Sequence, residues 1–319
     1  MRGSRSHPVL AAACCLGLLA GPLVAATPPA TAAAPSYVAL GDSYSSGTGT
    51  RTYIVDGTTC QRSVYAYPSL IASATGYSLN FRACSGATIR DVRRLQLGAL
   101  STRTAYVTIS VGGNDAGFAE VLTACALPWW AADCNGAIDR AQAYITGTLP
   151  SALSRLYAAI RSRATRADVV VVGYPRIFNG TDCNALTWFS SSEMTRLNAT
   201  ADLLDATTSR ASGAAGFGFA NPTRRFVGHA VCDDPEWING LSNPIWESYH
   251  PKRSGHRDGY LPLVSRRLTG TAVTGSAQVL RTARASAEQL AVQQRQYAAR
   301  DRLIEPEPVS PPSWRPRVR

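Results

Sequence analysis

The chain has 319 residues, of which 45% are hydrophobic, and a formal net charge of +11. The charge is unevenly placed: residues 1–34 hold two arginines and no acids, and residues 266–319 hold ten arginines and four acids. The remainder carries 20 basic and 17 acidic side chains, so nothing requires a nucleic-acid partner. The basic C-terminal end favours weak contact with anionic lipid or cell-wall polymer, and solubility is an alternative that needs no partner.

Residues 1–34 have the layout of a secretory signal peptide. Two early arginines precede an apolar stretch that begins at Val9, and Ala-x-Ala sites follow up to Ala34. The mature protein is therefore expected outside the cell. Cys14 and Cys15 lie in the apolar stretch, but neither has a leucine three residues before it, which argues against a lipid-anchored form.

Five short apolar segments predict strands, and segments with apolar residues at three- and four-residue spacing predict helices between them. The predicted strands are 37–40, 77–81, 105–111, 168–173 and 217–220, and the predicted helices are 64–74, 138–163 and 191–209. This alternation predicts a parallel sheet that is covered on both faces. We therefore expect a three-layer α/β/α domain over residues 35–268, with five parallel strands in flavodoxin-like order.

Residues 269–319 continue beyond this domain as a basic extension. The segment 277–304 is rich in Ala, Arg and Gln and has few large apolar residues, which predicts a surface helix. Residues 305–319 contain five prolines, which predicts disorder. We assign no catalytic role to the extension.

A Gly-Asp-Ser turn follows the first predicted strand and indicates that Ser43 is a nucleophile. Ligands of open α/β sheets bind at the carboxyl edge of the strands, where this turn lies. Asn114 follows two glycines after the third strand, and Gly86 follows the second strand. Their N–H groups can neutralise the oxyanion that forms when a serine attacks a carbonyl. A plain turn capped by Asn114 or Asp115 is the alternative.

His250 is the candidate base, because a serine hydroxyl needs a neighbour that takes its proton. Of the four histidines, His7 lies in the predicted signal peptide, which leaves His229, His250 and His256. Pro251 biases His250 toward an extended conformation, whereas His256 falls within the helix predicted to follow. The choice therefore favours His250.

These four motifs, in the order serine, glycine, asparagine and histidine, resemble those of the SGNH hydrolases of the GDSL esterase and lipase superfamily. The resemblance covers roughly residues 36–268. It implies that Ser43 is the nucleophile and that His250 is the general base. It also implies an oxyanion hole formed by the Ser43 N–H, Gly86 and Asn114. No metal or organic cofactor is needed.

The chain departs from this family at the residue that orients the base. The family's last motif usually reads Asp-x-x-His, whereas Glu247 stands three residues before His250. We expect Glu247 to hold the imidazole as an aspartate would. Two alternatives remain open: a backbone carbonyl orients His250 in a Ser-His dyad, as in some secreted actinobacterial relatives, or Glu247 is an ordinary solvated carboxylate.

Six cysteines follow the predicted signal peptide, and an even number in an exported chain favours three disulfides. Metal binding has no support from a Cys-x-x-Cys pair or an interleaved histidine. The resemblance to the secreted actinobacterial branch implies that neighbours pair. The expected bonds are Cys60–Cys84, Cys125–Cys134 and Cys183–Cys232.

Four tryptophans lie in predicted loops. Trp237 and Trp246 belong to the long irregular segment 226–248, and Trp129 and Trp130 belong to the small loop that a Cys125–Cys134 bond would close. Each pair either lines a substrate pocket or packs its own loop. These loops are expected to set substrate preference.

The predicted function is a secreted, monomeric carboxylic ester hydrolase that works through an acyl-Ser43 intermediate. Resemblance to the actinobacterial branch favours triacylglycerol or simple acyl esters, and then phospholipids, cleaved as by an A-type phospholipase. A carbohydrate acetyl esterase differs only in the shape of its pocket. A non-catalytic envelope-binding protein is the alternative from another class, and the complete set of Ser43, Gly86, Asn114 and His250 argues against it.

Overall fold

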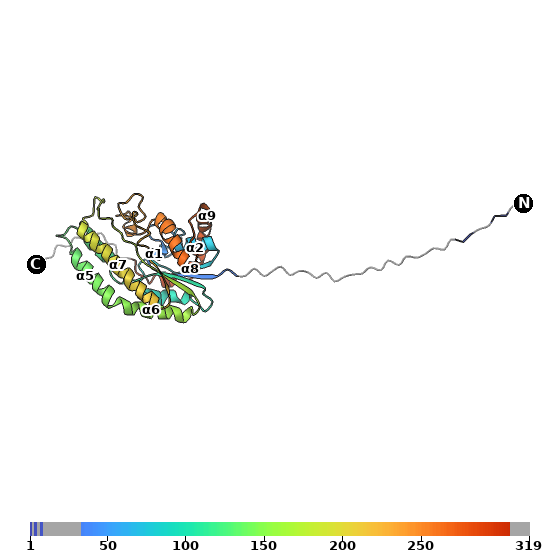
Figure 1. The fold of residues 1–319 in the computed structure, drawn as a ribbon, viewed down its shortest axis with the longest axis horizontal. Coiled ribbons are helices and arrows are strands. Elements are labelled where there is room, and N and C mark those ends of the chain that lie inside the picture. The colour runs from blue at the N-terminus through green and yellow to red at the C-terminus, as the bar shows by residue number, and fades with distance from the viewer. Residues whose placement is uncertain (2, 5–6, 9–32, 307–319) are drawn as a thin grey trace. The chain divides into compact units, whose positions relative to one another are not determined.

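The structure is a computed structural model that describes residues 1, 3–4, 7–8 and 33–306. The chain divides into two units, residues 1–33 and residues 34–319. Every helix and strand of the described residues lies in the second unit (Figure 1). The predicted signal peptide falls almost entirely outside the described residues, and so does the segment 307–319 of the predicted disordered end.

Five parallel strands form one sheet, in the order β2-β1-β3-β4-β5. The strands are β1 (Ser36–Gly41), β2 (Ser78–Phe81), β3 (Tyr106–Ser110), β4 (Asp168–Val172) and β5 (Gly218–Ala220). Leu40 of β1 pairs with Ile109 of β3, which pairs with Val171 of β4, and all three are buried. Strands that are covered on both faces are continuous apolar runs. The predicted flavodoxin-like order is confirmed.

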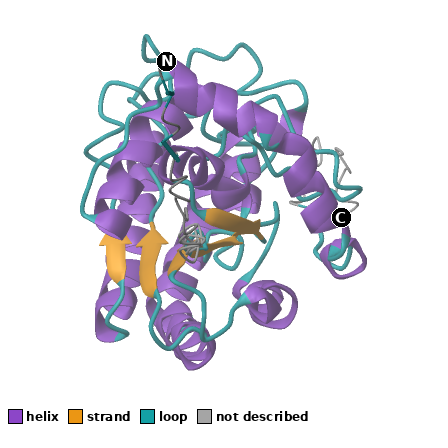
Figure 2. Ribbon diagram, turned by 90° about the vertical axis from the view of Figure 1, so that its right-hand side faces the viewer, coloured by secondary structure: helices purple, strands orange, loops and turns teal. Residues whose placement is uncertain are grey.

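Helices cover both faces of this sheet. One packed group contains α4 (Phe118–Ala126), α5 (Cys134–Gly147), α6 (Leu149–Arg163) and α7 (Ser191–Ala214), and the other contains α2 (Tyr67–Thr75), α8 (Leu261–Thr269) and α9 (Ala277–Ala285). Figure 1 shows α5, α6 and α7 on one side of the strands and α2, α8 and α9 on the other. Figure 2 shows the strands between helices. The three-layer α/β/α arrangement is therefore confirmed.

The single helix predicted over 138–163 is two helices, α5 and α6. Thr148 is the boundary residue between α5 and α6, and Pro150 lies in the first turn of α6. Proline has no N–H and clashes with the carbonyl four residues earlier, so it is tolerated in a first turn and not in a helix interior. The break follows from Pro150.

The basic extension packs onto the domain instead of forming one surface helix. It contains α9, α10 (Ala287–Arg295) and α11 (Ala298–Asp301). Helix α9 packs against α2, and α10 packs against β2. Leu290 and Ile304 are buried. The few apolar side chains of this segment are therefore enough to seat it on the sheet's edge.

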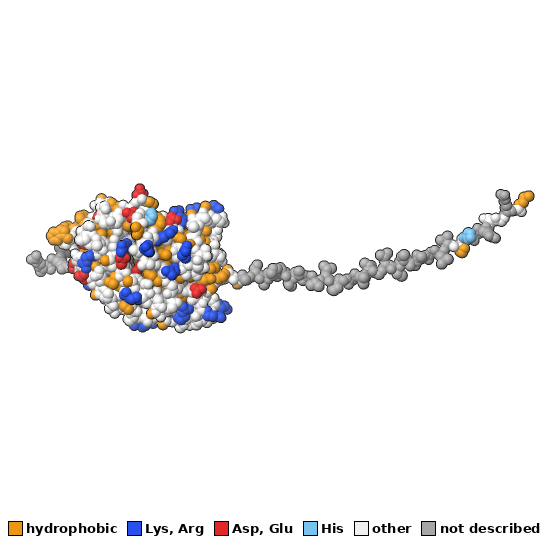
Figure 3. Space-filling view, in the orientation of Figure 1, with side chains coloured by type: hydrophobic (Ala, Val, Ile, Leu, Met, Phe, Trp, Pro, Cys, Tyr) orange, Lys and Arg blue, Asp and Glu red, His pale blue; other side chains and the backbone are white. Residues whose placement is uncertain are grey.

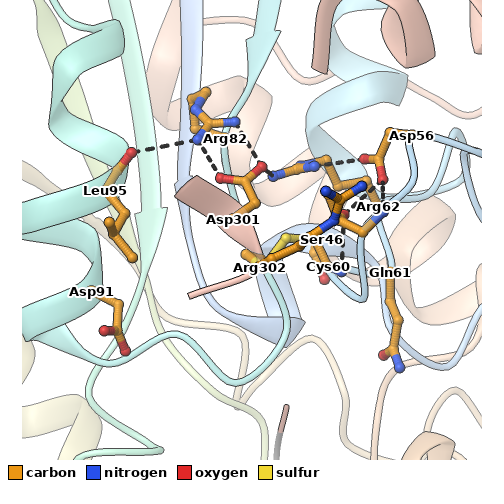
Figure 4. The surroundings of a disulfide bond; sticks show 12 residues. Ser46, Asp56, Cys60, Gln61, Arg62, Arg82, Asp91, Leu95, Asp301 and Arg302 are labelled. Carbon is orange, nitrogen blue, oxygen red and sulfur yellow. Dashed lines mark hydrogen bonds and ion pairs between the residues drawn. A yellow bond between two sulfur atoms is a disulfide. The ribbon is translucent and has the colours of Figure 1, made fainter. Parts of the chain in front are cut away.

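Asp301 of the extension joins two buried arginines (Figure 4). Its carboxylate lies 2.5 Å from Nη2 of Arg62 and 2.5 Å from Nη2 of Arg82. Asp56 accepts from Nη1 of Arg62 at 2.6 Å. All four side chains are at most 2% exposed. The cluster holds two cations and two anions, so its buried charge is balanced.

The surface seen in Figure 3 mixes basic and acidic side chains, without a single field of one sign. This agrees with the small charge surplus of the central part of the sequence. Among the residues that the structure describes, none of the helices combines the length and apolar character needed to cross a membrane.

Candidate active site

Ser43 begins the short helix α1 (Ser43–Ser46), directly after β1. Asp42 caps this helix, because its Oδ1 accepts from the Tyr44 N–H at 3.1 Å. Gly41 has a φ of +116°, and a Cβ there would lie 2.2 Å from the carbonyl oxygen of Ser110. Only glycine fits this turn. The turn places Ser43 at the carboxyl edge of the sheet, as predicted from the motif.

The turns that carry Gly86 and Asn114 are bonded to each other. Asn114 donates from Nδ2 to the carbonyl oxygen of Ala87 at 3.1 Å, and the Ile89 N–H donates to Asp115 at 3.0 Å. Gly86 lies between these contacts and the disulfide, with a φ of +81°. An amide nitrogen carries two hydrogens. Asn114 therefore has a second N–H to direct toward the cavity that it lines.

The carboxylate of Asp115 supports this junction from a partly buried position. Burial raises the pKa of Asp115 to about 6, and the hydrogen bond from Ile89 opposes that rise. The group is therefore mostly ionised at neutral pH, where it accepts the Ile89 N–H most strongly.

His250 lines the same cavity as Ser43. Its Nδ1 lies 2.9 Å from the carbonyl oxygen of Ser248. Because a carbonyl oxygen only accepts, Nδ1 carries the proton in the neutral ring and Nε2 is the basic nitrogen. The Tyr44 ring lies against the imidazole, with centroids 5.3 Å apart, and its hydroxyl donates to the Tyr249 carbonyl at 2.7 Å. These contacts fix the ring.

Glu247 does not take the position expected of an orienting acid. Its buried carboxylate lies 2.5 Å from Nε of Arg51 and accepts a hydrogen bond from the Tyr53 hydroxyl. Nδ1 of His250 has one hydrogen to donate, and the Ser248 carbonyl accepts it. These contacts favour the carbonyl alternative, and the orienting role of Glu247 stays a prediction. Glu247 links the segment before His250 to the loop at residues 51–53.

The other two histidines have different surroundings. His256 is fully buried, and burial lowers its pKa to about 3. Its Nδ1 accepts from the Tyr67 N–H at 3.3 Å. His229 stacks on Trp237 with ring centroids 3.7 Å apart. Neither ring lines the cavity beside Ser43, in the part of the chain that the structure describes.

Tyr174 is a site residue that the sequence reasoning missed. Its hydroxyl donates to Oδ2 of Asp42 at 2.5 Å and accepts from the Gly113 N–H at 3.4 Å. Burial and Asp42 raise the pKa of Tyr174 well above its usual value, so the hydroxyl keeps its proton. Tyr174 thereby links the turn of Ser43 to the turn of Asn114. Its one signal in the sequence was its place just after a predicted strand, 168–173.

The cavity beside Ser43 has a volume of about 210 Å³ and mostly apolar walls. These walls come from α4, the segment after β4, α7 and the loops before His250. They include Phe118, Leu122, Leu127, Ile177, Leu186, Leu204, Leu241 and Ile245. A pocket with apolar walls and a few convergent polar groups fits a ligand with an apolar chain.

The tryptophans in the loops do not form these walls, within the described ranges of the chain. Trp237 packs against Phe226 and Trp246 against Tyr53, with ring centroids 5.5 Å and 5.4 Å apart. This pair follows the packing alternative. Trp129 and Trp130 neither line the cavity nor pack into their loop, since both side chains are exposed.

The structure contains the three disulfides expected from the resemblance: Cys60–Cys84, Cys125–Cys134 and Cys183–Cys232. Cys84 of the first bond lies two residues before Gly86, so this bond holds the turn that carries Gly86. Over the described residues, no group of three or more His, Cys, Asp or Glu side chains is placed to hold a metal ion.

A doubly wound sheet with a serine, an imidazole and an amide at one apolar cavity defines the class of serine ester hydrolases. Residues 39–257 match the GDSL-like Lipase/Acylhydrolase family, and the chain belongs to this family. A protein named Lipase from Streptomyces rimosus is 43% identical over 234 residues, which are 73% of this chain and 86% of that protein. Lipase 1 from Streptomyces coelicolor is 44% identical over 237 residues, 73% of this chain and 87% of that protein.

Two solved structures are similar along their whole length. The extracellular lipase from Streptomyces rimosus has a TM-score of 0.69 at 42% identity, covering 73% of this chain and 100% of that one. Phospholipase A1 from Streptomyces albidoflavus NA297 has a TM-score of 0.68 at 38% identity, covering 74% of this chain and 100% of that one. The protein is a carboxylic ester hydrolase of the GDSL lipase and esterase type.

Proposed function

We propose that the protein is an exported lipase that hydrolyses carboxylic esters of lipids through an acyl-Ser43 intermediate. The observation that carries this proposal is a single apolar cavity lined by Ser43, Asn114 and His250 together. Three disulfides and an extracellular relative support export, because disulfides persist in oxidising compartments.

In the first step, Oγ of Ser43 attacks the acyl carbonyl carbon while Nε2 of His250 takes the hydroxyl proton. The carbonyl oxygen becomes negatively charged. It accepts hydrogen bonds from the N–H groups of Ser43 and Gly86 and from Nδ2 of Asn114. Tyr174 and the Ala87 carbonyl hold two of these turns in place before the substrate arrives.

The tetrahedral intermediate then collapses. The bond to the alcohol oxygen breaks, the alcohol leaves with the proton from His250, and the acyl group stays on Ser43. His250 next removes a proton from water while the water oxygen attacks the acyl carbonyl carbon. The bond between this carbon and Oγ of Ser43 then breaks, Oγ takes the proton back from His250, and the acid leaves. Throughout, the Ser248 carbonyl keeps the proton on Nδ1, so that Nε2 is the nitrogen that exchanges protons.

The apolar walls favour an acyl chain over a small acetyl group. Leu122, Ile177 and Leu204 offer an aliphatic chain only dispersion contacts and burial, which stabilise it in proportion to its area. An A-type phospholipase is the second candidate, because a structure at 38% identity carries that name. Both candidates use the same residues and differ in the leaving group.

The test is hydrolysis of p-nitrophenyl esters from acetate to palmitate by the wild-type protein, Ser43→Ala and the control Ser191→Ala, an exposed serine in α7. We expect turnover that rises with chain length and falls at least about 10⁴-fold in Ser43→Ala alone, as for other serine hydrolases. A preference for acetate would support a small-ester esterase instead. Full turnover in Ser43→Ala would contradict the mechanism, and no turnover in the wild type would favour a binding protein.

A further inference from the structure

We propose that an exposed apolar patch beside the cavity docks the enzyme on an uncharged lipid surface. The patch consists of Trp129, Trp130, Leu186 and Trp188, and we call it the tryptophan patch. This inference rests on the proposed function, because a docked enzyme needs a lipid substrate in the surface that it contacts.

The exposure of these side chains is unusual for residues so large. Trp129 is 86% exposed, Trp130 65%, Leu186 71% and Trp188 53%. Contiguous exposed apolar surface marks a site of interaction with protein or lipid. Tryptophan has an apolar body with one N–H, which suits the boundary between water and acyl chains.

Two loops form the patch, and a hydrogen bond joins them. The Trp188 N–H donates to the carbonyl oxygen of Ala126 at 3.1 Å. The Cys125–Cys134 bond closes the first loop. Within it, the Ala131 N–H donates to Pro128 at 2.8 Å, which makes a turn with Trp129 and Trp130 at its tip. The first loop is therefore shaped before any surface is met.

The second loop is held equally well. Asp182 accepts from the Thr187 hydroxyl at 2.7 Å and from the Phe189 N–H at 3.0 Å. The buried Phe189 ring packs against Phe178, with centroids 4.7 Å apart. Trp188 points outward between these fixed neighbours. Because a disulfide, hydrogen bonds and ring packing hold the two loops in shape, contact with a surface costs less ordering entropy.

The tryptophan patch is continuous with the cavity beside Ser43. Leu186 belongs to both, and Leu127, two residues before Trp129, also lines the cavity. Hydrophobic side chains gather at the end of the molecule where α5 and α7 begin, as a comparison of Figures 1 and 3 shows. An acyl chain that leaves a lipid surface under the patch would therefore reach Ser43 along apolar side chains.

The charge of the two loops identifies the kind of surface. Residues 127–132 read Leu-Pro-Trp-Trp-Ala-Ala and residues 184–189 read Asn-Ala-Leu-Thr-Trp-Phe, without a charged side chain. The charged residues that flank them in the two loops, Asp133 and Asp182, are both acidic and give no attraction to an anionic surface. Docking through them relies on burial of apolar area, which salt does not screen. Attraction of the basic extension to an anionic surface would weaken with salt. Binding measured at different ionic strengths therefore distinguishes apolar docking from electrostatic attraction.

The binding test uses full-length Ser43→Ala protein, which does not consume the lipid, and phosphatidylcholine vesicles in a sedimentation assay. We expect equal binding at 0.1 and 0.5 M NaCl. Adding Trp129→Ala and Trp130→Ala should weaken binding at least about tenfold, given the area a tryptophan buries. Val292→Ala, an exposed apolar residue of α10, is the matched control and should bind unchanged.

Trp188→Ala tests the second loop separately and should also weaken binding. Unchanged binding after all three tryptophan substitutions would overturn the proposal, as would loss of binding at high salt. A dimer that the same substitutions dissociate would assign the patch to a second copy of the chain and would equally overturn it.

Kinetics separate this inference from the proposed function. In the active enzyme, Trp129→Ala with Trp130→Ala should keep turnover of soluble p-nitrophenyl butyrate within about twofold, since neither residue lines the cavity. Hydrolysis of vesicle lipid should fall at least about tenfold. An equal loss on both substrates contradicts docking but leaves Ser43 chemistry intact. Turnover that survives Ser43→Ala contradicts the chemistry and leaves the binding result intact.

Discussion

At His250, a backbone carbonyl holds the position that a carboxylate holds in many serine hydrolases. The Ser248 carbonyl fixes the tautomer of the ring but brings no full negative charge to the imidazolium. The nearby carboxylate of Glu247 is occupied by Arg51 and Tyr53. The backbone just before His250 therefore sets the orientation of its ring, and Glu247 ties that backbone to Arg51 and Tyr53.

We expect Glu247→Gln to lower kcat by less than about tenfold, because the Ser248 carbonyl stays on Nδ1. Thermal stability should fall, since Arg51 loses its buried ion-pair partner. Steady-state kinetics on a soluble ester and a melting curve measure both. A loss of about 10⁴-fold in kcat, the usual cost of removing an orienting carboxylate, would show that Glu247 is the third member of a triad.

Tyr174→Phe should lower kcat about 10- to 100-fold with little change in KM, because the links to Asp42 and Gly113 position groups that act in the transition state. Tyr157→Phe is the matched control, since the hydroxyl of this buried tyrosine has no hydrogen-bond partner among the residues that the structure describes. It should retain kcat. Equal effects of the two substitutions would mean that Tyr174 contributes packing alone.

Site residues could be predicted from sequence only where the chemistry depends on the side chain. Ser43, Asn114 and His250 stand in motifs that indicate a role for each side chain, and all three line one cavity in the structure. The Ser248 carbonyl could not be predicted, because every residue has a carbonyl and only the fold selects one. Tyr174 was hidden for a related reason: a tyrosine after a strand is common, and its two partners lie far away in sequence.

Between α7 and β4, a buried carboxyl group of Asp205 makes stability depend on pH. Its Oδ1 accepts from the Tyr174 N–H at 2.8 Å, and its side chain is 1% exposed. Burial raises the pKa of Asp205 to about 8. The folded protein therefore holds a proton that the unfolded chain releases at about pH 4.

This difference sets the sign of the pH effect. The stabilising protonated form is fully present below about pH 4, and its advantage is lost as pH rises toward 8. Asp205→Asn keeps an acceptor for Tyr174 and cannot ionise. We expect the variant and the wild type to melt at similar temperatures at pH 5, and the variant to melt higher at pH 8.5. A difference that does not change with pH would contradict the assignment.

Elements could be predicted where apolar periodicity is strong. The buried strands and α7 were found from sequence, and the strand order followed from strand and helix alternation. The helices of the extension were misjudged, because Leu290 and Ile304 are too sparse to signal a packed face. Besides these apolar contacts, a charge holds the helices, Asp301, whose arginine partners lie more than 200 positions earlier in sequence.

On the scale of the whole molecule, the extension completes the buried charge balance of the catalytic domain. Burial lowers the pKa of Arg82, and Asp301 opposes this effect. The two segments that meet at Asp301, around Arg62 and Arg82, are the same ones that the Cys60–Cys84 bond joins (Figure 4). Cutting the chain after Leu268 would therefore disturb the domain as well as remove basic residues.

We expect Asp301→Asn to lower the free energy of unfolding by about 3–5 kcal/mol, because it leaves a buried cation without its partner. Asp202→Asn is the control, since it breaks a half-exposed pair with Arg176 and should cost at most about 1 kcal/mol. Urea unfolding of the three proteins compares them. Equal stabilities would show that the extension rests on the domain without supporting it.

The most direct test of the central claim is peptide mass spectrometry after reaction with an alkyl fluorophosphonate, which phosphonylates an activated serine. We predict one adduct, on the peptide that contains Ser43, in the wild-type protein. Ser43→Ala and His250→Ala should give no adduct, whereas Glu247→Gln should still react. An adduct on another residue, or ester hydrolysis that persists in Ser43→Ala, would contradict the assignment of Ser43 as the nucleophile.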